Sequence, residues 1–114
     1  MKVLMRGIHL SLTDSLRNYA NSHLVEPISR YMDDEASEIE IALVDINGPK
    51  GGVDKECRVT VRIAGMSAIH VTETAETLFQ AIDGMRDRLQ NTVKRSVEKR
   101  REVPSQGLPE DVRY

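Results

Sequence analysis

The stretch Glu56-Cys57-Arg58-Val59-Thr60-Val61-Arg62-Ile63 has the clearest two-residue period in this chain. Its odd-numbered side chains are apolar or small, and its even-numbered side chains are polar or charged. Because successive side chains of a strand point to opposite faces, this pattern predicts a strand with one face in the core and one in water. Cys57, the only cysteine, falls on the core face, so we interpret it as a core residue rather than an activated thiolate.

Three more strands are predicted around this one. Residues 38–43 alternate isoleucine and leucine with glutamate and alanine, as a half-buried strand does. Residues 64–67 form a tight connection to residues 68–72, where Ile69 and Val71 point inward, and this arrangement predicts a hairpin. Residues 2–6 alternate weakly and predict the first strand, and Gly7 after them predicts a bulge or the end of regular pairing.

A first helix is predicted to follow Thr13, a residue type that caps helix N-termini. Apolar residues recur at helical spacing from Leu12 to Ile28, so one face of this helix belongs to the core. Pro27 lies inside the pattern, where it lacks a donor and its ring crowds the carbonyl four residues back. The sequence therefore predicts a kink, or two short helices.

A second, longer helix is predicted from about Ala75 to Arg101, with a stripe of Leu78, Ile82, Met85, Leu89 and Val93. At ~1.5 Å per residue it would span ~40 Å, more than a domain of this size can cover. Its C-terminal end is expected to project beyond the core.

The element order β-α-β-β-β-α predicts an α+β fold. Each helix has one apolar stripe and each strand one apolar face, so we expect a four-stranded, mainly antiparallel sheet with both helices on one face. Such an arrangement is like a double-stranded-RNA-binding domain, with the other sheet face open to water. The 114 residues fit one domain over 1–101, and residues 102–114, with two prolines and a glycine, are predicted to be a disordered tail.

Positive charge is concentrated in the second helix. Residues 86–101 hold seven bases and two acids, a net of +5, so the rest of the chain carries −7 of the total of −2. Bases near a helix C-terminus also suit the helix dipole, and a merely solvated helix end is the alternative. Seven bases are more than capping requires, and Arg58 and Arg62 add charge on the open sheet face. The sequence therefore predicts contact with nucleic-acid phosphates.

Other kinds of site find little support. His9, His23 and His70 lie on different elements without a triad or metal-ligand spacing. Residues 48–52 lack the lysine and serine or threonine of a nucleotide-binding loop, and residues 33–35 lack the alternating ligands of a calcium loop. No catalytic residue, metal, cofactor or small-molecule substrate is expected. With four aromatic residues and none paired on the strands, RNA recognition should rest on backbone and shape.

The compartment is expected to be the cytoplasm. No apolar run approaches 18 residues, Arg6 interrupts the apolar N-terminus, and a single cysteine fits a reducing environment. We expect no association with membranes.

Two regions resemble the ribosome hibernation-promoting factor and ribosome-associated inhibitor family, also called sigma-54 modulation proteins. They are residues 12–19, and residues 73–76 leading into 81–83 and 88–89. The resemblance covers residues 1 to about 101, and the length is similar to the short form of the family. It implies a stress-response factor that binds the small ribosomal subunit and its 16S-type rRNA in the mRNA and tRNA channel, inhibiting translation and protecting idle ribosomes.

The resemblance also implies that basic side chains of the two helices contact rRNA. His23, Glu26 and Pro27 depart from the usual basic pattern in the first helix, and Asn91, Thr92 and Val97 do so in the second. A protein-interaction module and a general double-stranded RNA binder remain alternatives. The positions matching the family are Arg17, Arg88, Lys94, Arg95 and Lys99, and the full set of RNA-binding candidates adds Arg58, Arg62, Arg86, Arg100 and Arg101.

Overall fold

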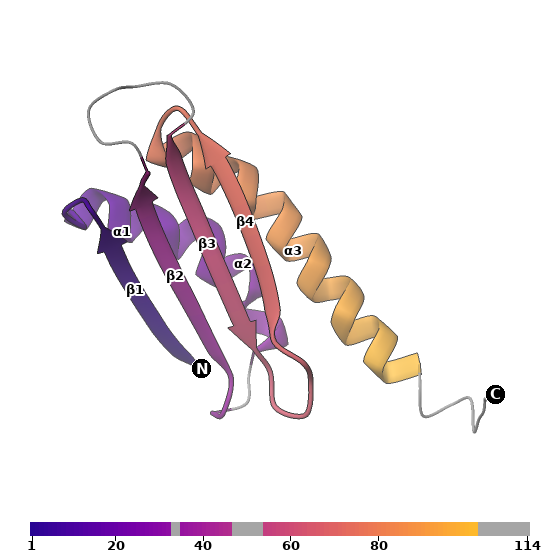
Figure 1. The fold of residues 1–114 in the computed structure, drawn as a ribbon. Helices are drawn as coiled ribbons and strands as arrows, with labels where there is room; N and C mark the ends of the chain where they lie inside the picture. Colours follow the sequence, from indigo (N-terminus) through magenta and orange to yellow (C-terminus); the bar gives the residue numbers. More distant parts are fainter. Residues whose placement is uncertain (33–34, 47–53, 103–114) are drawn as a thin grey trace.

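The computed structural model of the chain describes residues 1–32, 35–46 and 54–102, with side chains through Lys99. Residues 33–34 and 48–52, which were considered above as candidate sites, lie outside these residues. The predicted tail 102–114 also lies outside them except for Glu102, which is the last residue of α3 and not part of a tail. Four strands form one sheet in the order β1-β2-β3-β4 (Figure 1). They are β1 (Lys2–Ile8), β2 (Glu38–Asp45), β3 (Lys55–Arg62) and β4 (Ile69–Ala75).

The sheet is mixed, with two antiparallel pairs and one parallel pair. β2 pairs with β3, and β3 with β4, in antiparallel register, as the sequence predicts. β1 pairs with β2 in parallel, with Lys2 opposite Glu38 and Ile8 opposite Val44. A parallel pair needs a crossover that returns the chain to the same end of the sheet, and the first helical segment supplies it. The predicted α+β fold with a mainly antiparallel sheet is confirmed.

The first helical segment is divided by a π turn. It comprises α1 (Asp14–Ala20), the π-helical η1 (Asn21–Val25), α2 (Glu26–Ile28) and the 3₁₀ turn η2 (Ser29–Tyr31). The Thr13 cap is confirmed, since its Oγ1 accepts from the Leu16 N–H at 3.2 Å. The π turn, in which the Glu26 N–H donates to the Asn21 carbonyl, comes just before Pro27. The sequence predicted a kink or two short helices at Pro27, and the structure has two short helices. The wide π turn between them accommodates a proline, which has no N–H to donate.

The long helix, α3, runs from Leu78 to Glu102. The expected start at Ala75 is wrong, because Ala75 still pairs with Lys55 in the sheet. Thr77 caps the helix instead: its Oγ1 accepts from Gln80 N–H at 3.1 Å and its carbonyl from Ala81 N–H at 3.0 Å. The C-terminal end of α3 extends beyond the sheet (Figure 1). No helix within the described residues is long and apolar enough to cross a membrane.

The core lies between the sheet and the two helical segments, which cover one face (Figure 1). Most of the inward-facing residues predicted from the two periodicities are buried, and Ile63, Ile69 and Leu78 are partly buried at the edge of the core. Cys57 is fully buried, and loss of solvent raises its pKa to about 12. The fully buried large side chains are Leu24, Ile28, Met32, Ile39, Ile41, Leu43, Val59, Val61, Ile82, Met85, Leu89 and Val93.

Gly7 is neither a bulge nor the end of pairing, because it continues β1 opposite Leu43. The chain turns back sharply after the strand, and His9 takes a left-handed φ of 61°. A Cβ on Gly7 would lie 2.7 Å from the Leu10 carbonyl oxygen and 2.8 Å from its Cδ1. Glycine is needed here for the close approach of the turn.

Candidate nucleic-acid interface

The predicted RNA-binding residues lie on two surfaces. Arg17 is exposed on α1, and five described bases are exposed on α3, which continues the helical layer. Arg58 and Arg62 belong to β3 and point to the opposite, open face of the sheet. The backbones of Arg100 and Arg101 lie in the last turns of α3, and their side chains are outside the described part.

Three bases near the end of α3 have their charges free. Lys94, Arg95 and Lys99 are exposed, and none of them has an ion pair or side-chain hydrogen bond with a described residue. They follow Val93, the last fully buried side chain among the described residues of α3, and Val97 is only partly buried against the core. They therefore lie where the helix begins to leave the core. Groups in this position can approach a phosphate without first breaking an internal interaction.

Arg88, in contrast, is held against the sheet. Its Nη1 donates to Glu73 Oε1 at 2.8 Å and to the Thr72 carbonyl at 3.1 Å. Gly84 makes this possible, since a Cβ there would lie 2.9 Å from Glu73 Oε2. The Arg88 side chain remains 60% exposed, but a carboxylate already offsets its charge.

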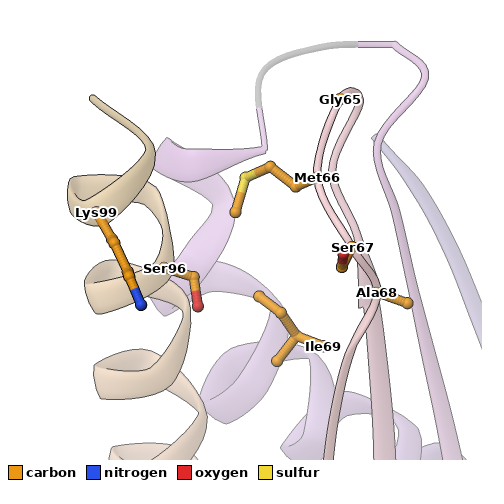
Figure 2. Close-up of a pocket in the computed structure, with 7 residues that line it drawn as sticks. All are labelled: Gly65, Met66, Ser67, Ala68, Ile69, Ser96 and Lys99. Atoms are coloured by element: carbon orange, nitrogen blue, oxygen red, sulfur yellow. The ribbon is translucent and has the colours of Figure 1, made fainter. Parts of the chain in front are cut away.

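Arg88, Arg95 and Lys99 share one side of α3. Their spacings of seven and four residues bring them into one row along the helix. Because Arg88 donates a hydrogen bond to Glu73 of β4, this side of α3 faces β4. Lys99, further along the same side, lies opposite the β3–β4 connection (Figure 2). The row therefore runs along the seam between α3 and the hairpin.

The arginines of the open sheet face alternate with carboxylates. Arg62 Nη1 donates to Glu38 Oε2 at 2.9 Å and to Glu40 Oε1 at 3.3 Å, and Arg58 Nε donates to Glu56 Oε1. Arg6 lies 4.0 Å from Glu40. Carboxylates of β2 offset the charges of Arg62 and Arg6, and Glu56 of the same strand offsets the charge of Arg58. This face is therefore a weaker attractant for phosphate than α3.

An aromatic cluster joins α1 to the start of α3. The Tyr19 ring stacks on His23 at 3.9 Å between centroids and meets Phe79 edge-on at 4.9 Å. Tyr19 Oη donates to Asp83 Oδ1 at 2.6 Å, and this hydrogen bond raises the Tyr19 pKa. Phe79 keeps 40% of its surface exposed. The sequence showed aromatics on both helices but not that they meet.

A groove between the β3–β4 connection and α3 is a further feature that the sequence did not reveal. It has a volume of about 500 Å³ (Figure 2). Met66 and Ile69 point into it from the hairpin, and Ser96 and Lys99 extend toward it from α3. The pattern of residues 64–67 predicted only a tight turn, and nothing in it indicated that α3 passes beside that turn.

Comparison with known proteins agrees with this fold. The chain is 27% identical over 118 residues to the ribosome hibernation promotion factor of Picosynechococcus sp., with 97% of this chain and 60% of the relative covered. The chain thus spans about 60% of that relative's length. The crystal structure of the Thermus thermophilus Protein Y N-terminal domain matches with a TM-score of 0.65 and 29% identity, over 83% of this chain and 98% of that one.

A ribosomal subunit interface protein from Coxiella burnetii has the same fold, with a TM-score of 0.62 and 20% identity over 83% of this chain and 96% of that one. Residues 3–101 match the family model described as Sigma 54 modulation protein / S30EA ribosomal protein. This match spans both helical segments, all four strands and most of α3. The chain belongs to the Sigma 54 modulation protein / S30EA ribosomal protein family.

Proposed function

We propose that this chain is a ribosome-associated hibernation factor. It binds 16S-type rRNA of the small subunit with the bases of α3, occupies the mRNA and tRNA channel, and stabilises idle ribosomes in the cytoplasm by steric inhibition, without catalysis. The names of the relatives support a ribosomal role. The observation that carries the proposal is the set of free charges at Lys94, Arg95 and Lys99 on the part of α3 that leaves the core.

A net charge of −2 is compatible with a polyanionic partner because the charges are separated in space. On the open sheet face, Glu38, Glu40 and Glu56 are paired with arginines. The free bases lie on α3, and they are the groups that can displace counterions from RNA.

We rank the candidates for rRNA contact by whether their charges are already paired with a carboxylate. Lys94, Arg95 and Lys99 come first, with Arg100 and Arg101 extending the series along the helix, and Arg17 and Arg86 are exposed without an ion pair among the described residues. Arg88, Arg58 and Arg62 come second, because each must leave or share a carboxylate to contact phosphate.

Co-sedimentation with purified small subunits across a salt series tests it. Reversal of Lys94, Arg95 and Lys99 to glutamate should abolish association, and the wild type should lose ~10³ to 10⁵ in affinity between ~50 and ~200 mM salt if ~6 to 10 phosphates are contacted. Reversal of Lys2, Arg6 and Arg30 is the control, since it changes the net charge equally on other elements.

The alternatives predict other results. Unchanged association of the α3 variant would contradict the proposal. Plain duplex RNA should compete poorly with the small subunit for this protein. If it competed as well as the subunit does, the protein would be a general double-stranded RNA binder. Recovery of one stoichiometric protein partner without ribosomes would favour a protein-interaction module.

A further inference from the structure

The groove between the hairpin and α3 combines three chemical properties. Met66 and Ile69 form an apolar wall, and Lys99 brings an unpaired ammonium to the rim beside the Ser96 hydroxyl (Figure 2). Among the described residues, Ser67 and Ala68 have no hydrogen bond on their main-chain groups. An apolar wall, free main-chain donors and acceptors, and a cation together suit a ligand with a flat apolar part, polar edges and a negative charge.

The hairpin side of the groove is already shaped. The Met66 N–H donates to the Ile63 carbonyl at 3.0 Å and closes the turn, and Gly65 takes the left-handed φ of 79° that the turn requires. The other wall is a helix whose preceding turn is anchored in the core by Val93. A ligand would therefore meet walls that need little ordering on binding.

The surrounding charge selects among ligands of this kind. Arg95 and Lys99 follow one another along the row that leads into the groove, and neither is paired with a described carboxylate. This row suits a chain of regularly spaced negative charges better than it suits a lone carboxylate on a peptide. A nucleotide of an RNA strand has such a chain on its backbone and a base with a flat apolar face.

We propose that the groove receives one unstacked nucleotide of a single-stranded rRNA segment. The base packs against Met66 and Ile69 with its edge toward the main chain of Ser67 and Ala68, and the adjoining phosphates lie on Lys99 and Arg95. Proteins usually recognise RNA sequence by binding the unstacked bases of single-stranded segments. The inference rests on the proposed function and adds a sequence-reading contact to an interface otherwise made of phosphate contacts.

Two substitutions separate the base contact from the phosphate contact. Met66→Ala should weaken binding to the small subunit by about fivefold without changing its salt dependence, because it removes only apolar contact. Lys99→Ala should weaken binding and reduce the salt slope by about one, since it removes a phosphate contact. Leu4→Ala is the matched control, because Leu4 is an exposed apolar side chain on the open sheet face.

A diazirine analogue of methionine at position 66 supplies a direct readout. Irradiation of its complex with small subunits should attach position 66 to a single rRNA nucleotide, and the same group at position 4 should give no such adduct. The groove inference would be overturned if Met66→Ala bound small subunits with wild-type affinity, or if position 66 were attached only to ribosomal protein. Either result would leave the proposed function standing. Failure of the wild type to bind small subunits would overturn both.

Discussion

At the scale of single residues, the structure shows why particular side chains occupy their positions. Gly7 is required because the turn after β1 brings the Leu10 carbonyl within 2.7 Å of where a Cβ would be. Gly84 has a different role, since the nearest atoms to a Cβ there would belong to the side chain of Glu73 and not to the backbone. Cys57 is a core residue, as its parity in β3 predicted.

Gly7→Ala should lower the free energy of unfolding by about 1–3 kcal/mol, because the backbone of the turn must move to admit the methyl group. Urea unfolding measures the change. Gly84→Ala is the control: Glu73 can swing away, and alanine favours the helix by about 1 kcal/mol, so little stability should be lost. Equal stability of Gly7→Ala and the wild type would show that the turn can relax.

The pKa of Cys57, raised to about 12 by burial, makes stability fall at high pH. Up to its ordinary pKa near 9 the thiol is protonated in both states. Between about 9 and about 12 it ionises in the unfolded chain alone, so stability relative to Cys57→Ala should decrease by up to ~1.4 kcal/mol per pH unit.

Urea unfolding of the wild type and Cys57→Ala between pH 8 and pH 11 measures this difference, because the other titrating groups are common to both. The native thiol should also react slowly with a thiol reagent at pH 9 and fast once the chain is unfolded. If the free energies of unfolding of the two proteins changed equally with pH, the thiol of Cys57 would not be buried and protonated in the folded chain.

At the scale of elements, the pairing of β4 with α3 determines which bases are available. Thr72 and Glu73 of β4 hold Arg88, and the next bases on the same side, Arg95 and Lys99, lie beyond their reach and are free. The expected start of α3 at Ala75 was wrong for a related reason. Pairing with Lys55 keeps Ala75 in the sheet, and the Thr77 cap then starts the helix.

Glu73→Gln should strengthen binding to the small subunit and steepen its salt dependence by up to about one, because it removes the carboxylate that offsets Arg88. Exposed ion pairs contribute only ~0–1 kcal/mol, so the fold should persist. Glu76→Gln makes the same charge change at an exposed residue before α3. An equal gain from both variants would indicate that net charge, and not release of Arg88, controls affinity.

At the scale of the whole molecule, positive charges that pair with no described carboxylate lie on the C-terminal part of α3, and the rest of the chain has a net negative charge. α3 is 25 residues long, yet only its first part packs on the sheet, and the bases accumulate after that part ends. Acidic residues are paired on the opposite sheet face, so the two surfaces differ in how strongly they attract phosphate.

A peptide covering residues 78–102 should bind rRNA without preferring the small subunit over plain duplex RNA. Its apolar stripe would lack the sheet, so it should be only partly helical in water, and the groove against the hairpin would be missing. Circular dichroism and competition binding measure the two properties. Selectivity equal to that of the full chain would mean that the sheet contributes nothing to recognition.

Much of this protein follows from its sequence alone. The two-residue period of residues 56–63 and the helical stripe from Leu78 to Val93 predicted the buried faces, because burial demands apolar side chains at the spacing of each element. The concentration of bases after Arg86 is likewise a property of the chain itself. These signals are local, so they can be recognised without knowing the fold.

Tertiary structure alone decided the parallel pairing of β1 with β2, the pairing of Arg88 and Arg62 with carboxylates, and the groove beside Lys99. Arg62 and Glu38 are 24 residues apart, and Arg88 and Glu73 are 15 apart. Sequence periodicity shows which face a side chain occupies but not which strand or helix lies next to it. The charge that a base can offer to RNA depends on that neighbour, and for this reason the free bases of α3 emerge only from the folded chain.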